Sequence, residues 1–205
     1  IMLSGNPIIR TFGHICSPQK SDLERNVREF HLHEIIVTIM DNMDETLKQN
    51  IVAEITEHAK AGEVLYLASG GSSISVTIAV VNALPPEVRA RLTFTLTDER
   101  YGKVGHTDSN WRQLLAGGLD LSGITTLPVL SGAATSIEAT ATLFGDRLMK
   151  LFAKKPYVIA LFGVGADSHI AGILPESPAA QEKERPVVAY HAGEYERLTI
   201  TPQIF

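Results

Sequence analysis

An acid and an imidazole two residues apart, Asp167 and His169, are the residues of this chain best suited to moving protons. They occur in GVGADSHIAG, a segment that follows the apolar residues 157–162. A histidine is a ready general base because its charge changes near neutral pH. In the alternative interpretation, His169 only hydrogen-bonds the backbone of its own loop. The same loop contains three further candidate site residues, Gly163, Gly165 and Ser168.

The segment ASGGSSIS, at residues 68–75, is suited to binding a phosphate group. Its glycines let the backbone turn sharply and expose N–H groups, its serines add hydroxyl donors, and the positive end of a predicted helix follows. The alternative is a plain strand-to-helix turn with a serine cap, and neither a P-loop nor a dinucleotide fingerprint is present. The candidate residues are Ser69, Gly70, Gly71, Ser72 and Ser73.

A third polar segment, TDERYGKVGHTDSN, begins where a predicted strand ends. Asp98 and Glu99 are followed at once by Arg100, whose fork of donors is suited to holding an anion. The alternative for this triplet is an ion pair at the surface. Three other polar residues are expected to be solvated or to order the loop, namely His106, Asp108 and Asn110.

Composition and motifs exclude several other chemistries. The chain has 18 basic and 23 acidic residues, a net charge of −5, which disfavours nucleic acid but leaves room for a small anion held by local charge. Its histidines lack paired zinc-ligand spacing, its one cysteine, Cys16, is remote, and no G-x-S-x-G elbow of a serine hydrolase occurs. We therefore expect no bound metal.

The same features point to a cytoplasmic protein. A lone cysteine cannot form an internal disulfide, which suits a reducing compartment. No apolar run approaches the roughly 18 residues of a membrane span, and the first residues do not resemble a signal peptide. We expect neither a membrane nor a nucleic acid as partner, and the oligomeric state stays open.

Strand-like and helix-like segments alternate along the chain. This alternation predicts an α/β fold with a mostly parallel sheet covered by helices on both faces. Strands are expected at residues 34–40, 63–69, 91–97, 124–130, 157–163, 185–191 and 196–202, and helices at residues 21–30, 41–62, 72–84, 109–118 and 135–155. Residues 98–109 are expected to form a loop. We expect one domain over residues 1–205, in which residues 1–30 are an extension that is hard to place.

The ligand site of such a sheet lies beyond the carboxyl ends of its strands. Three loops follow strands there, at residues 69–73, 98–109 and 163–175, and they contain most of the candidate residues above. The sequence therefore predicts one site for a small anionic ligand.

Taken in series, LASGGSS, TDERYGKVGHTDSN and LFGVGADSHIAGILP resemble the three signature loops of the 6-phosphogluconolactonases. This family is similar to the glucosamine-6-phosphate deaminases and shares a modified Rossmann-like fold with them. DER followed by DSN, and ILP after the histidine, favour the lactonase branch. The resemblance covers roughly residues 35–202. Compared with the family, the chain stops early at TPQIF, so the C-terminal part of the family fold is expected to be missing.

The resemblance implies hydrolysis of 6-phosphogluconolactone to 6-phosphogluconate in the pentose phosphate pathway, without metal or other cofactor. His169 would deprotonate the attacking water and Asp167 would help to place its imidazole. Arg100 would contact the phosphate or the lactone oxygen. The glycine-serine loop would hold the phosphate, together with Arg197 in ERLTIT. Ser168 stands where the family usually has glycine.

Two alternatives stay open, one a different enzyme and the other a protein of a different class. One is a deaminase or isomerase acting on an amino-sugar phosphate, with Asp98 as the base that shuttles a proton. The other is a catalytically weak protein that binds sugar phosphates, in which Ser168 and the early end of the chain impair catalysis.

Overall fold

A parallel sheet of six strands forms the centre of the computed structural model, which describes residues 9–15, 38–39, 44–154 and 156–204. The strand order is β2-β1-β7-β3-β4-β6, and each neighbouring pair is parallel. The strands are β1 (Ile9–Ile15), β2 (Thr38–Ile39), β3 (Val64–Ala68), β4 (Leu92–Leu96), β6 (Thr125–Leu127) and β7 (Tyr157–Val164). The predicted α/β class with a parallel sheet is confirmed.

The strands β3, β4 and β7 lie next to one another in the sheet, and most of their residues are buried because both of their faces are covered. Every residue of β3 is buried, as is the run from Val158 to Phe162 in β7. Burial on both faces gives continuous apolar runs instead of alternation. These strands also share one register, in which Val64 lies beside Leu92 of β4 and Tyr157 of β7.

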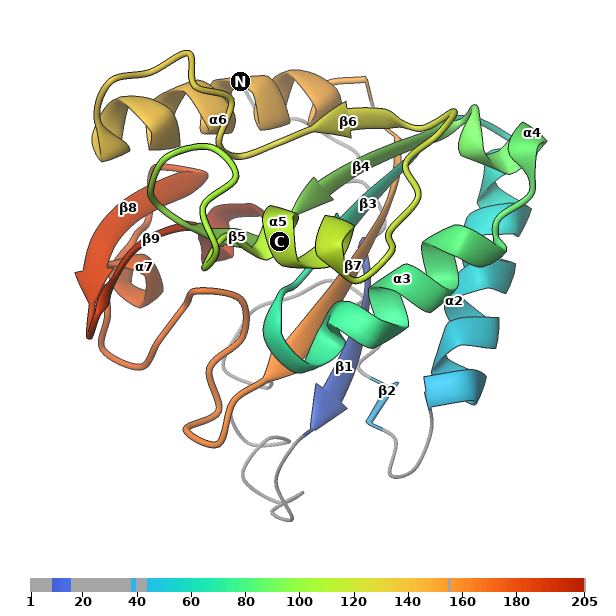
Figure 1. The fold of residues 1–205 in the computed structure, drawn as a ribbon, viewed down its shortest axis with the longest axis horizontal. Coiled ribbons are helices and arrows are strands. Elements are labelled where there is room, and N and C mark those ends of the chain that lie inside the picture. Colours follow the sequence, from blue (N-terminus) through green and yellow to red (C-terminus); the bar gives the residue numbers. More distant parts are fainter. Residues whose placement is uncertain (1–8, 16–37, 40–43, 155, 205) are drawn as a thin grey trace.

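Helices flank this sheet, as Figure 1 shows. They are α2 (Asp44–Ala59), α3 (Ile74–Ala83), α4 (Pro86–Arg89), α5 (Asn110–Ala116), α6 (Ile137–Phe152) and α7 (Pro178–Gln181), with short 3-10 turns at η1 (Gly71–Ser73) and η2 (Pro202–Ile204). The helices α2 and α3 pack together on one side, and α6 lies on the other side beside β8. Ile51 and Ile55 of α2 are fully buried, as their spacing of four residues predicts.

A second sheet is antiparallel and has the order β5-β9-β8, from β5 (Asp98–Arg100), β8 (Val187–Ala192) and β9 (Tyr195–Ile200). The prediction of a loop over residues 98–109 is therefore wrong at its start. Asp98 to Arg100 pair with Thr199 to Arg197 of β9. A three-residue polar strand is set by this distant partner, and local composition does not reveal it.

Some predicted elements lie outside the described residues. These are the helix at 21–30, Cys16, and all of the strand at 34–40 except Thr38–Ile39. The strand β1 was not predicted. Among the described residues, no helix is both long and apolar enough to cross a membrane.

Candidate functional site

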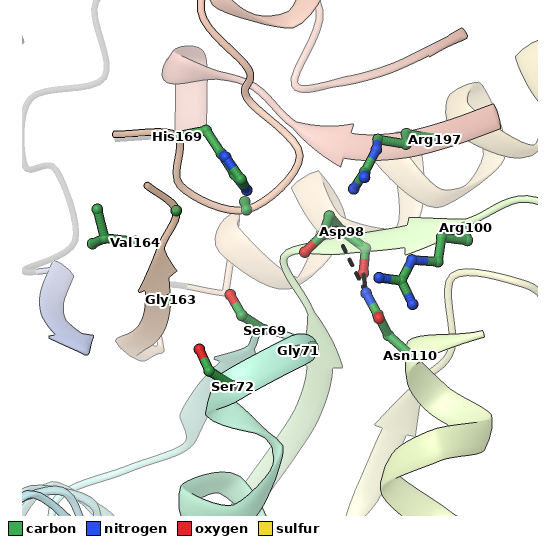
Figure 2. A pocket seen from close by; sticks show the side chains of 13 residues that line it. Ser69, Gly71, Ser72, Asp98, Arg100, Asn110, Gly163, Val164, His169 and Arg197 are labelled. Atoms are coloured by element: carbon green, nitrogen blue, oxygen red, sulfur yellow. Dashed lines mark hydrogen bonds between the residues drawn. The ribbon is translucent and has the colours of Figure 1, made fainter. Parts of the chain in front are cut away.

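A cavity of about 320 Å³ lies at the carboxyl ends of β3 and β7, next to the antiparallel sheet. All three polar loops contribute to it (Figure 2), so the structure brings together segments that lie far apart in the chain, from Ser69 to Arg197. Its lining residues are Ser69, Gly70, Gly71, Ser72, Asp98, Arg100, Asn110, Gly163, Val164, Gly165, His169, Ala171 and Arg197.

The hydroxyl of Ser69 joins the central strands at the base of the cavity. It donates to the carbonyl of Leu161 in β7 at 2.9 Å and shares a 2.8 Å hydrogen bond with Thr97, just after β4. Ser69 is 4 % exposed. Its hydroxyl therefore fixes the start of the glycine-serine loop, in addition to lining the cavity.

The rest of this loop divides into a face toward the cavity and a face toward the interior. Gly71 has a φ of 61°, in the left-handed region that favours glycine, and this turn leads the chain into η1 and α3. Ser72 lines the cavity. Ser73 is fully buried, does not line the cavity, and its Oγ has no hydrogen-bond partner among the described residues. Sequence reasoning did not separate these two neighbouring serines.

Glu99 is buried behind the cavity wall and orders the loop that follows it. Its carboxylate accepts four hydrogen bonds, from the backbone N–H of Arg100, Asn110 and Trp111 and from the hydroxyl of Ser109. Burial raises the pKa of Glu99, while these hydrogen bonds act in the opposite direction. Glu99 does not line the cavity, and it acts on the site through its neighbours.

Asp98 presents a buried carboxyl group at the cavity. It is 6 % exposed and accepts hydrogen bonds from the Thr97 hydroxyl at 3.1 Å and from Nδ2 of Asn110 at 3.4 Å. Burial raises its pKa, against the opposing effects of Thr97 and the positive charges of Arg197 and Arg100.

Two arginines reach the cavity from adjacent strands. Arg100 of β5 lies opposite Arg197 of β9, and both guanidinium groups lie near the Tyr195 ring, at 5.1 and 5.8 Å from its centre. Arg100 donates to the carbonyl of Asp108 at 3.0 Å. Neither arginine makes an ion pair with a residue in the described part of the chain, and in both the buried Nε lacks a hydrogen-bond partner there. The cavity therefore has positive charge suited to an anion.

His169 is paired with Asp167 on the opposite wall. The Nδ1 atom of His169 lies 2.5 Å from Oδ1 of Asp167. Partial burial raises the pKa of Asp167, but the hydrogen bonds and charge of His169 outweigh this effect and lower the pKa below its ordinary value. His169 lines the cavity, whereas Asp167 stands behind it. This pairing orients the imidazole and leaves Nε2 available to a ligand or water.

The backbone of this loop is tightly constrained around the imidazole. The N–H of Gly165 donates to the carbonyl of His169, and that of Ser168 donates to Gly165. A Cβ atom at position 165 would lie 2.3 Å from the His169 ring, so glycine is required there. Ser168 has a φ of 66°, which explains why glycine suits this position in the family pattern.

Three cavity residues were not predicted as site residues, namely Asn110, Val164 and Ala171. The sequence predicted only that Asn110 helps to order its loop. The signal that could have identified it is its place directly after Ser109, the N-cap of α5. Among the described residues, no group of three or more histidine, cysteine, aspartate or glutamate side chains could hold a metal ion.

The parallel sheet and the cavity at its carboxyl edge define an α/β protein whose candidate site contains two arginines and a histidine. The family model of glucosamine-6-phosphate isomerases and 6-phosphogluconolactonases matches residues 38–205. The chain belongs to this family, and the resemblance stated from its three loops is confirmed.

Curated relatives include a 6-phosphogluconolactonase from Pseudomonas aeruginosa, 33% identical over 126 residues, which are 58% of this chain and 50% of the relative. Another from Streptomyces coelicolor is 25% identical over 167 residues, 74% of this chain and 64% of the relative. The chain thus spans about half to two-thirds of these two proteins. The crystal structure of a 6-phosphogluconolactonase from Shewanella baltica superimposes with a TM-score of 0.62 at 17% identity, covering 98% of this chain and 76% of that one, and shows the shared fold.

Proposed function

We propose that this chain hydrolyses 6-phosphogluconolactone to 6-phosphogluconate, with His169 as general base. The observation that carries the proposal is one cavity lined by a histidine paired with Asp167, by two arginines without ion pairs in the described part of the chain, and by a glycine-serine loop before a helix. These are the groups that a phosphorylated ester substrate requires: a proton acceptor for water and positive groups for its charges.

In this mechanism, His169 takes a proton from water while the water oxygen attacks the lactone carbonyl. Arg100 contacts the phosphate or the lactone oxygen, and it acts mainly by binding the substrate. The carbonyl carbon then releases the ring oxygen, which receives the proton and becomes a hydroxyl, and the product is a carboxylic acid. A lactone is an activated ester, so no covalent intermediate on the protein is needed.

In the proposed mechanism, binding of the phosphate group orients the lactone ring. Gly70, Gly71 and Ser72 form the start of η1 and lie just before α3, where free N–H groups and the helix dipole favour an anion, and Arg197 is the second phosphate contact. Binding energy gained at the phosphate is thereby used to align the carbonyl with His169.

Asp98 favours one alternative, a deaminase or isomerase acting on an amino-sugar phosphate. Its carboxyl group is buried in the same cavity, and its raised pKa would suit a proton shuttle on a sugar carbon. The family model covers both glucosamine-6-phosphate isomerases and 6-phosphogluconolactonases. The third candidate, a binding protein, requires only the anion site.

A direct assay distinguishes the three functions. Fresh 6-phosphogluconolactone and glucosamine 6-phosphate are supplied separately, and acid release, ammonia release and thermal shift are measured. We expect acid release above spontaneous lactone opening, and a crystal soaked in phosphate should contain the anion at residues 70–72. Ammonia release would assign the deaminase, and a thermal shift without turnover would assign the binding protein.

A further inference from the structure

The side chain of Asn110 lies where the glycine-serine loop meets the arginine-bearing strand. Its Nδ2 atom donates to the backbone carbonyl of Asp98 at 3.1 Å and reaches the Asp98 carboxyl group at 3.4 Å, as Figure 2 shows. On the loop side, a Cβ atom added to Gly70 would lie 2.1 Å from Oδ1 and 2.3 Å from Cγ of Asn110. The amide is therefore in direct contact with the Gly70 backbone.

The residue that bears this amide is fixed by burial and by a hydrogen bond to Glu99. Asn110 is 2 % exposed and is the first residue of α5, where its N–H donates to Oε1 of Glu99 at 2.7 Å. The same carboxylate accepts the N–H of Arg100 at 2.8 Å. One buried group thus fixes both the residue that bears the amide and the residue that bears the guanidinium. Rotating the amide would break its own hydrogen bonds to Asp98, and displacing the backbone that bears it would break the bond to Glu99, so both movements are costly.

We propose that Asn110 is a positioning residue that sets the separation between the glycine-serine loop and Arg100, and that position 70 must be glycine because the Asn110 amide occupies the space of a side chain. The proposal rests on the proposed function, since it deepens the anion site of that function. Asn110 acts through the loop, and its Oδ1, which has no hydrogen-bond partner in the described part of the chain, is buried against Gly70.

The contact predicts that two substitutions compensate each other. Gly70→Ala pushes the loop or the amide aside and should raise KM for the lactone at least tenfold, with a matching rise in the inhibition constant of inorganic phosphate. Asn110→Ala should raise both constants by about tenfold because the loop loses its support. In the double variant the alanine methyl group occupies the vacated space, so both constants should equal those of Asn110→Ala alone.

Two control variants separate this effect from general damage. Gly62→Ala tests glycine replacement where nothing lies within 4 Å of the new Cβ atom. Asn82→Ala removes an exposed amide that binds backbone at Gly118 and Asp120. Both controls should leave KM and the phosphate inhibition constant unchanged. A purely structural role of Asn110 would lower the melting temperature without changing either constant, and would contradict the proposal.

The proposal is also testable if the wild-type chain does not hydrolyse the lactone. Urea unfolding of the parent, the two single variants and the double variant measures the coupling of positions 70 and 110 without any substrate. The double variant should be no less stable than Gly70→Ala. If Gly70→Ala fails to fold alone, recovery of folded protein in the double variant supports the contact. Additive losses, or no recovery, overturn the proposal whatever the activity of the parent.

Discussion

His169 and Arg100 enter one cavity from different parts of the fold, so their contributions to the proposed hydrolysis are separable. We expect His169→Asn to lower kcat by about 10²–10⁴ with little change in KM, because it removes the proton acceptor and leaves the phosphate contacts. We expect Arg100→Ala mainly to raise KM, by a loss of about 1.5–3 kcal/mol for a charge-assisted contact. A pH-stat assay at several lactone concentrations, corrected for spontaneous opening, measures both. Near-parent kcat in His169→Asn would make the histidine structural.

A single substitution at residue 168 should raise the free energy of unfolding, because the backbone there is strained. Ser168 has a φ of 66°, which costs a non-glycine residue roughly 1–2 kcal/mol, while glycine loses more chain entropy on folding. Ser168→Gly should therefore raise the free energy of unfolding by up to about 1 kcal/mol and keep or raise lactonase activity. Urea unfolding and the lactone assay measure the two effects. A large loss of activity would instead reveal a role for the serine hydroxyl.

At the scale of elements, the turn from α7 into β8 depends on one carboxylate. Glu182 accepts hydrogen bonds from the N–H groups of Lys183, Glu184 and Arg185 and from the Arg185 side chain. These bonds, led by those of the Glu184 and Arg185 backbone, lower its pKa to about 2. The folded-state pKa lies below the unfolded value, so Glu182 stabilises the fold above the unfolded pKa and loses this effect as pH falls toward 2.

We therefore expect Glu182→Gln to be less stable than the parent near pH 7, with a difference that shrinks as the pH falls from about 4.5 to about 2. Urea midpoints at pH 7, 5, 3 and 2 measure it. Glu194→Gln, at an exposed position in the hairpin of β8 and β9, is the matched control. A difference that is unchanged at pH 2 would mean that the charge of Glu182 does not support the turn.

The elements that sequence could predict are those whose own residues determine them. β3 and β7 are apolar runs because both of their faces are buried, β4 alternates leucine and phenylalanine with threonine, and α2 shows its buried face in Ile51 and Ile55. β1 and β5 were missed because their own residues, IRTFGHI and DER, form no apolar run, and their pairing with β7 and β9 is not visible in the local sequence. Strand pairing of this kind depends on distant residues more than on local propensity.

The residues of the candidate site likewise include some that the sequence could identify and some that it could not. The glycine-serine loop, Arg100 and His169 were identified because their residue types suggest chemistry in any context, and the structure brings them to one cavity. The position of Asn110 could not be predicted, because its contact with Gly70 exists only after two loops meet. The burial of Ser73 behind Ser72 likewise depends on how η1 packs against β7.

For the whole molecule, the net charge of −5 contrasts with a cavity that contains Arg100 and Arg197. In the proposed function, the positive charge of these arginines attracts the phosphorylated substrate, and salt screens this attraction. We expect kcat/KM for the phosphorylated lactone to fall several-fold between about 10 mM and 500 mM salt, and Arg197→Ala to flatten this dependence. The unphosphorylated lactone is the control and should show little dependence on salt. Equal salt effects on both lactones would contradict steering by the cavity.

The place of β1 has a consequence for how the chain acquires its structure during synthesis. β1 comes first in sequence yet lies inside the sheet, where Ile9 pairs with Val158 of β7. β1 also pairs with the two-residue strand β2, but its pairing over all seven residues is with β7 and can form only after β7 has left the ribosome, whereas β3 and β4 are separated by a single crossover. In refolding experiments followed by hydrogen exchange, amides of β3 and β4 should gain protection before those of β1. Simultaneous or earlier protection of β1 would show that this pairing nucleates folding instead.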